Sequence, residues 1–242
     1  MPNEKTRIFC CLVAILLLLV ALYGFIVLKT PKAIWDPSPQ NLVISLDKVW
    51  EETDYSDIPA VQIWGDGKIV WVENLPEGSR KVFEGKIEPQ EITSLLQKTI
   101  DLGFFKPTRK SKNYAGTYIS VTLINGSHSE WVDPDNQQLM EIVNSLKTGA
   151  GSKGEPYVPT SGIIFAFPIE DTEHRNITKA DFLWPSTLFG SSLEPMSDIK
   201  EGVEISGEKL AFAWQVVNSP AAAVESEGKV YWVYLQVDKL SQ

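Results

Sequence analysis

Residues 61–72 read VQIWGDGKIVWV. Two runs of β-branched and aromatic residues flank a Gly-Asp-Gly triplet, and such runs suit the pleated, half-buried surface of a strand. The two glycines can supply the positive φ angles that a tight connection needs, and the Asp66 side chain can bond the turn backbone. The stretch therefore predicts a β-hairpin in which Asp66 is structural, with no role as a catalyst or metal ligand.

A helix is predicted after this hairpin, beginning at Glu88 and ending near Gly103. Pro89 suits the first helical position, and apolar residues then recur at helical spacing. Gly103 suits the position just past a helix C-terminus, and we expect Phe104 and Phe105 to fold back onto the core.

The same order then recurs. Residues 118–132 predict a second hairpin with a type I′ turn at Asn125-Gly126, and residues 133–149 predict a second helix. With a strand beginning at Leu42, residues 41–150 are expected to form an α+β domain. Its antiparallel sheet has two helices on one face, in the order β-ββα-ββα.

The remainder of the chain, residues 155–242, predicts a β-rich C-terminal module. Strands are expected at 163–167, 210–217 and 230–237, with no strong helix, and the Gly-rich stretch 149–154 is interpreted as a linker. Either a separate small module or an extension of the first sheet fits this pattern.

The N-terminus carries an uncharged apolar run of 21 residues, Ile8–Leu28. A helix of this length spans roughly 31 Å, against a hydrocarbon core of about 30 Å. The run exceeds the core of a cleaved signal peptide, and Cys10 and Cys11 stand at its start, where a lipoprotein cysteine would end it. We therefore expect a retained transmembrane signal-anchor, with the lipid bilayer as its partner.

The flanking regions complete this topology. Residues 1–7 form a short head that is expected in the cytoplasm, and residues 29–40, with three prolines, are interpreted as a stiff spacer. The large C-terminal part then lies outside the cytoplasm, anchored in the plasma (inner) membrane.

Composition excludes several classes of function. Residues 33–242 contain 18 Lys and Arg against 30 Asp and Glu, a net charge of −12, which disfavours binding to nucleic acid. The same residues contain no cysteine, so thiol nucleophiles, disulfides and thiolate metal sites are excluded there.

No motif predicts a catalytic, metal or cofactor site. His128 and His174 are the only histidines, and they lack the spacing of a metal site. Acid pairs such as Asp54 with Asp57 are not singled out by any spacing. Asp133, near the second helix, is better explained by capping than by calcium binding.

Tryptophan offers the one candidate for binding. Of the eight tryptophans, Trp64, Trp71 and Trp214 lie on predicted strands, where exposed aromatic side chains can bind a glycan or an envelope protein. Packing in the core is the alternative. Trp35, close to the bilayer, is interpreted separately as an interfacial anchor.

The GDG triplet at 65–67, the helix start Glu88-Pro89-Gln90-Glu91 and the ending Gly103-Phe104-Phe105 resemble a broad group of uncharacterised bacterial envelope proteins. Those proteins carry this hairpin before a helix ending in Gly-Phe-Phe, behind a signal peptide or single anchor. The resemblance covers roughly residues 42–146, with a weaker echo at residues 157–159 (YVP) and 213–218 (AWQVVN). It implies a location in the envelope, with no catalytic residue to transfer.

Three hypotheses about function follow. The first is a single-pass, extracytoplasmic binding or interaction module of the cell envelope. The second is a hydrolase that uses an unidentified carboxylate pair, and the third is a structural subunit of a membrane complex. Nothing in the sequence requires an enzyme.

Overall fold

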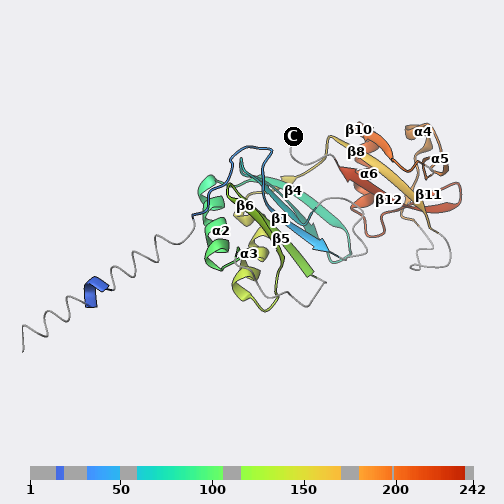
Figure 1. The fold of residues 1–242 in the computed structure, drawn as a ribbon. Coiled ribbons are helices and arrows are strands. Elements are labelled where there is room, and N and C mark those ends of the chain that lie inside the picture. The colour runs from blue at the N-terminus through green and yellow to red at the C-terminus, as the bar shows by residue number, and fades with distance from the viewer. Residues whose placement is uncertain are drawn as a thin grey trace, which may run out of the picture.

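The structure, a computed structural model, describes residues 15–18, 32–49, 59–105, 116–169, 180–197 and 199–237. It confirms an α+β fold with a large antiparallel sheet, and it adds a second sheet formed by the C-terminal part of the chain (Figure 1).

The first sheet has seven strands in the order β6-β5-β1-β2-β3-β4-β7, and every neighbouring pair is antiparallel. The strands are β1 Leu42–Val49, β2 Val61–Trp64, β3 Lys68–Asn74, β4 Arg80–Lys86, β5 Gly116–Leu123, β6 Gly126–Trp131 and β7 Glu155–Pro156. Strand β4 was not predicted, because its sequence RKVFEGK is mostly polar. It pairs with β3 along its whole length, so the observed order is β-βββα-ββα.

The β2–β3 hairpin forms as predicted, although its two glycines act differently. Gly67 has φ +91° and donates its N–H to the Trp64 carbonyl, so it needs the left-handed region. Gly65 does not have a positive φ. A Cβ there would lie 2.0 Å from the Asp36 carbonyl oxygen, so glycine is needed at position 65 because the backbone of Asp36 packs directly against it. Asp66 accepts the Lys68 N–H at 3.0 Å and is structural, as expected.

The β5–β6 hairpin also forms, but its predicted turn is wrong by one residue. Leu123 pairs with Gly126, so the two connecting residues are Ile124 and Asn125. Neither has a positive φ, which a type I′ turn would require at both positions. Gly126 begins β6 at φ +141° instead.

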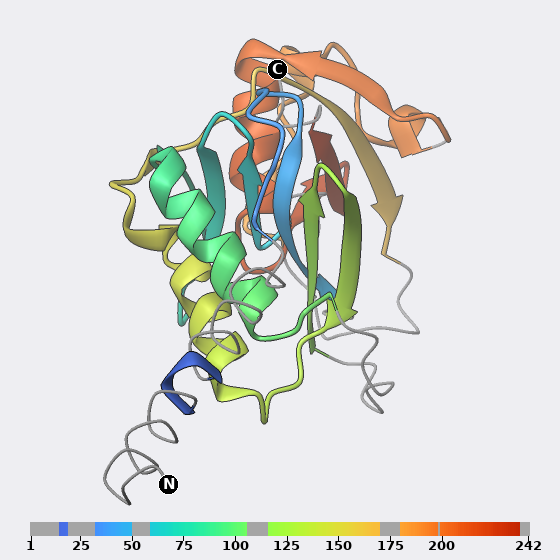
Figure 2. The same cartoon turned by 60° about the vertical axis from the view of Figure 1, so that its left-hand side comes forward.

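Two helices cover one face of this sheet, as Figure 2 shows: α2 Pro89–Asp101 and α3 Gln137–Lys147. A capping box between Glu88 and Glu91 begins α2, and the Asn136 side chain caps α3 by accepting the Leu139 N–H at 3.2 Å. The buried faces of both helices join one core with the facing side chains of the sheet. The helix prediction is therefore confirmed, including burial of Phe104.

The Gly-rich stretch 149–154 is not a free linker. Gly149 and Gly154 lie against the indole of Trp71, where a Cβ would come within 2.7 and 2.6 Å of the ring carbons. A short 3-10 helix, η1 Gly149–Gly151, and strand β7 then tie this segment to the first sheet.

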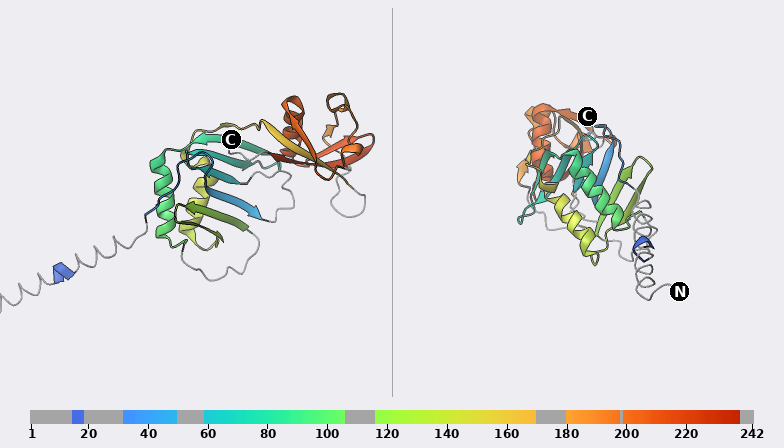
Figure 3. Two further views of the ribbon diagram at one scale, coloured as in Figure 1. Left: turned by 45° about the horizontal axis from the view of Figure 1, so that its top comes forward. Right: turned by 90° about the vertical axis from the view of Figure 1, so that its left-hand side faces the viewer.

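The second sheet has five strands in the order β10-β8-β12-β11-β9. They are β8 Ser161–Pro168, β9 Phe182–Leu183, β10 Val203–Ser206, β11 Ala223–Ser226 and β12 Lys229–Val237. Two four-residue helices, α4 Ser186–Phe189 and α5 Glu194–Ser197, lie between β9 and β10 in the chain. The strands expected at 163–167 and 230–237 are confirmed, and this sheet lies at the opposite end of the molecule from α2 (Figure 3).

The strand expected at 210–217 is wrong, because these residues form a helix, α6 Gly207–Val217. Residues 210–217, LAFAWQVV, are apolar apart from Gln215, and such a short apolar run fits either a strand or a buried helix. Leu210, Ala213 and Val217 fall on one helical face. That face is buried as α6 packs across the second sheet. Tertiary packing thus selects the helix over the strand.

The two sheets share a core. Trp64, Val70 and Val82 project from the face of the first sheet opposite α2 and α3, and they join the same cluster as α6 and the second sheet. Within the C-terminal part of the chain, β7 therefore belongs to the first sheet, and strands β8 to β12 form a second sheet that packs against it.

Of the predicted anchor Ile8–Leu28, only residues 15–18 are described, and they are helical; the rest of it, and the head 1–7, lie outside the described residues. None of the helices in the described part of the chain is both long and apolar enough to cross a bilayer.

The described part of the predicted spacer, residues 32–40, packs against the first sheet instead of standing free. Ala33 is buried, and the Trp35 indole donates to the Gly65 carbonyl at 3.2 Å. The segment is thus docked on the domain.

Candidate functional site

A pocket of about 570 Å³ opens where β4, the segment after β7 and helix α6 meet. Its wall is mainly apolar and aromatic, and among the described residues that line it only Arg80 and Lys81 are charged. None of these described lining residues is a carboxylate, although acids outnumber bases in the chain. We call this the interface pocket; it is lined by Ser79, Arg80, Lys81, Val82, Phe83, Pro156, Tyr157, Val158, Phe182, Ala211, Trp214, Gln215, Asn218, Ser219 and Pro220.

Tyr157 and Trp214 form the aromatic part of the wall. Their rings meet edge to face with centroids 6.0 Å apart, and the Tyr157 N–H donates to the Val82 carbonyl at 2.9 Å. The Lys68 ammonium lies 5.6 Å from the Tyr157 ring centroid, within range of a cation–π interaction. Burial raises the pKa of the Tyr157 phenol to about 12, with a further contribution from the charge of Glu84. The phenol is therefore neutral at physiological pH and can donate or accept a hydrogen bond.

Arg80 joins β4 to the C-terminal end of α6. Its guanidinium donates to the Val217 carbonyl at 2.9 Å, and its backbone N–H donates to the Asn218 carbonyl at 2.9 Å. A cation at a helix C-terminus complements the helix dipole, so this contact holds the two sides of the pocket together.

Asn218 contributes a polar atom with unused capacity. Its side-chain nitrogen donates to the Trp214 carbonyl at 2.8 Å, which fixes the orientation of the amide. Its Oδ1 is buried and has no hydrogen-bond partner in the structure. A buried amide oxygen without a donor among the described residues carries a desolvation cost.

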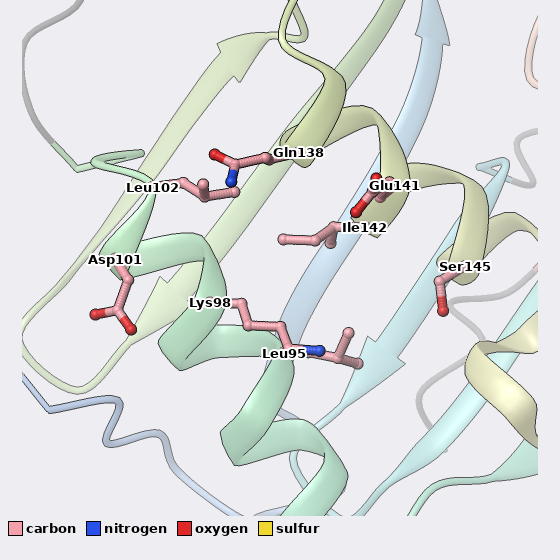
Figure 4. Close-up of a pocket in the computed structure, with 8 residues that line it drawn as sticks. All are labelled: Leu95, Lys98, Asp101, Leu102, Gln138, Glu141, Ile142 and Ser145. Atoms are coloured by element: carbon pink, nitrogen blue, oxygen red, sulfur yellow. The ribbon is translucent and has the colours of Figure 1, made fainter.

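A second pocket, of about 330 Å³, lies between α2 and α3 (Figure 4). Leu95, Leu102 and Ile142 supply its apolar part. Both signs of charge surround it, because Lys98 comes from α2 and Glu141 from α3. This groove has no aromatic lining residue, so it offers less for specific recognition than the interface pocket.

The three predicted tryptophans lie in different places. Trp64 and Trp71 are 2% and 3% exposed and belong to separate cores on opposite faces of the first sheet. Only Trp214 is partly exposed and lines a pocket. The three side chains therefore do not form one surface, and of the three only Trp214 is placed where it could contact a ligand.

Other candidates from the sequence have structural surroundings or lie outside the described residues. His128 is half-buried against Phe104 and lies 3.4 Å from the Glu130 carboxylate. His174 and the pair Asp54 and Asp57 lie outside the described residues. Within the described part of the chain, no group of three or more His, Cys, Asp or Glu residues could hold a metal ion.

Sequence reasoning missed Arg80, Tyr157 and Asn218. They come from β4, the end of β7 and the end of α6, so no local spacing connects them. The sequence pointed to Trp214 as an aromatic residue on a predicted strand, which is a helix in the structure. The family resemblance also touched residues 157–159 and 213–218 but assigned them no role.

Comparison of the chain with protein-family models, with curated proteins and with solved structures found no significant match.

Proposed function

We propose that this protein is a single-pass, membrane-anchored binding module of the bacterial envelope, as its resemblance in residues 42–146 implies. Residues 8–28 cross the inner membrane, and the two-sheet domain lies outside the cytoplasm and binds its ligand in the interface pocket. The observation that carries the binding role is this pocket, with Trp214 and Tyr157 beside Arg80 and without a lining carboxylate.

Exposure of the N-terminal helix supports the anchor. Residues 15–18 are Ile, Leu, Leu and Leu in helical conformation, and their exposed fractions are 57%, 62%, 64% and 62%. Four consecutive residues point to all sides of a helix, so this turn is apolar all round and is not buried against the domain. A lipid environment accounts for both facts.

Chemistry of the wall defines the ligand class. A flat apolar or aromatic group can pack against Trp214 and Tyr157, and a negative charge can face Arg80 and Lys81. The ligand is therefore an aromatic or apolar anion, free or part of an envelope protein. No acid pair lines the pocket, so a carboxylate-pair hydrolase has no support there.

Ligand-observed NMR tests the pocket with a defined probe. The full chain is placed in lipid nanodiscs and titrated with 2-naphthalenesulfonate, a flat aromatic anion. Trp214→Ala should weaken binding about tenfold or more, because loss of a central aromatic contact costs about 1.4 kcal/mol or more. Neutral 2-naphthalenemethanol should bind more weakly than the sulfonate.

Trp131→Ala is the matched control. Trp131 is also half-buried and also contacts a tyrosine edge to face, Tyr118 at 5.3 Å, but it does not line the pocket. Equal losses of binding in the two variants would reject the interface pocket as the site.

Protease protection tests the topology. A tag at the C-terminus should be digested by protease added outside the inner membrane, while a tag at the N-terminus stays protected. Protection of the C-terminal tag in intact spheroplasts would reverse the proposed orientation.

A further inference from the structure

The chain after the proposed anchor is docked on the domain from its first described residues. The Ala33 N–H donates to the Gln97 side chain on α2 at 3.1 Å. The Ile34 carbonyl accepts the Ile124 N–H at 2.9 Å, which ties the segment to the β5–β6 turn. The domain therefore cannot move away from residue 33 without breaking these bonds and exposing the buried Ala33.

Chain length limits how far the domain can stand from the bilayer. Four residues, 29–32, separate Leu28 from Ala33. Fully extended, the five Cα–Cα steps reach at most about 18 Å. The headgroup region adds about 5 to 8 Å on each side of the hydrocarbon core. The surface around Ala33 is thus held close to the headgroups, whatever path those four residues take.

That surface carries two exposed isoleucines. Ile34 is 50% exposed and Ile124 is 62% exposed, and their backbones are hydrogen-bonded to each other. We call this pair the isoleucine corner. Lys32 is exposed beside it in the chain and can pair with lipid phosphate. An apolar corner with a flanking cation fits a membrane interface.

We propose that the domain rests on the phospholipid surface through the isoleucine corner, with Ile34 and Ile124 inserted among the headgroups. This inference rests on the proposed membrane anchor. It also fixes an orientation. The second sheet lies at the end of the molecule remote from α2, so in this pose the second sheet points away from the bilayer (Figures 1 and 3).

Lipid-depth quenching tests the contact in the full chain. All variants carry Cys10→Ser and Cys11→Ser, and one new cysteine is labelled with the fluorophore NBD. The protein is placed in nanodiscs of phosphatidylcholine and phosphatidylglycerol, with or without lipids brominated near the headgroup. We expect the label at Ile124→Cys to be quenched several-fold more strongly than one at Leu183→Cys. Leu183 is a matched control, since it is 73% exposed but lies in the second sheet.

Two further variants separate the outcomes. A label at Leu17→Cys, read with lipids brominated deep in the acyl chains, reports the anchor itself. Ile34→Ser should reduce quenching at position 124. If position 17 is quenched while position 124 equals position 183, the anchor stands and the docked pose is rejected. If position 17 is not quenched, the membrane anchor of the proposed function fails first.

Discussion

At the scale of single residues, Trp71 explains a glycine-rich stretch that was interpreted as a linker. Its indole occupies the space where Gly149 and Gly154 would carry side chains, and it also stacks on Phe83 with centroids 5.5 Å apart. Gly154 is the cleaner of the two glycines to test, because only Gly149 has a positive φ, of +78°.

Gly154→Ala is therefore expected to destabilise the protein by about 1 to 3 kcal/mol, the usual cost of overpacking a filled site. Chemical denaturation of the full chain in detergent, followed by tryptophan fluorescence, measures the change. In a Trp71→Leu background the same substitution should cost less, because the smaller side chain leaves room. Equal costs in both backgrounds would show that Trp71 is not the obstacle.

Tyr157 makes a second prediction at this scale. Its pKa of about 12 lies above the ordinary value of about 10, and burial is the main cause. The folded state thus keeps the phenol protonated where the unfolded state loses the proton. The resulting stability is present in full below about pH 10 and is lost as the pH rises toward 12.

Absorbance at 295 nm measures this titration as the difference between the parent and Tyr157→Phe. The transition of Tyr157 should appear near pH 12. It should move to lower pH in Glu84→Gln, because this variant removes the negative charge that contributes to the raised pKa. A transition at about pH 10 in the folded protein would contradict the buried position of the phenol.

At the scale of elements, the junction of β4 and α6 holds the molecule together. Strand β4 supplies Arg80, whose guanidinium and backbone N–H meet the last carbonyls of α6. Neither element was predicted correctly from the sequence. Strand β4 was not predicted, and a strand was predicted where α6 forms.

Arg80→Ala is expected to lower the free energy of unfolding by about 1.5 to 3 kcal/mol, the range for hydrogen bonds that involve a charged group. Arg80→Lys should recover part of the loss, since it keeps the charge without the planar fork. Lys81→Ala is the control, because this neighbouring cation is exposed and should change stability by less than about 0.5 kcal/mol. Similar losses in the Arg80 and Lys81 variants would mean that the contact with α6 adds nothing.

At the scale of the whole molecule, the shared core makes the two sheets one folding unit. Trp64, Val70 and Val82 are buried only because α6 and the second sheet complete their cluster. Without α6 and the second sheet, these three side chains would form a large exposed apolar patch on the first sheet.

A chain that ends at Gly154 should therefore bind 8-anilinonaphthalene-1-sulfonate strongly and associate, where the full chain does not. Size-exclusion chromatography and dye fluorescence in matched detergent measure both properties. A monomeric, cooperatively unfolding fragment with the midpoint of the full chain would show that residues 41–150 are an independent domain.

Local signals in the amino-acid sequence were enough to predict several elements. The GDG hairpin, the α2 helix with its capping box and Gly103, and the apolar face of α3 all depend on contacts within a few residues. The apolar run at residues 8–28 likewise predicts an anchor from its length alone, and that prediction awaits the quenching and protease experiments.

Tertiary structure alone decided what depends on distant partners. Residues 210–217 fit a helix or a strand, and burial against the second sheet selected the helix. The polar strand β4 exists because β3 pairs with it, and the β5–β6 turn shifted by one residue because the strand register places Leu123 opposite Gly126. The interface pocket brings β4, Tyr157 and α6 together across more than a hundred residues of chain. Local propensities depend on neighbouring residues and do not identify contacts between distant parts of the chain. The pocket could therefore be identified only from the tertiary structure.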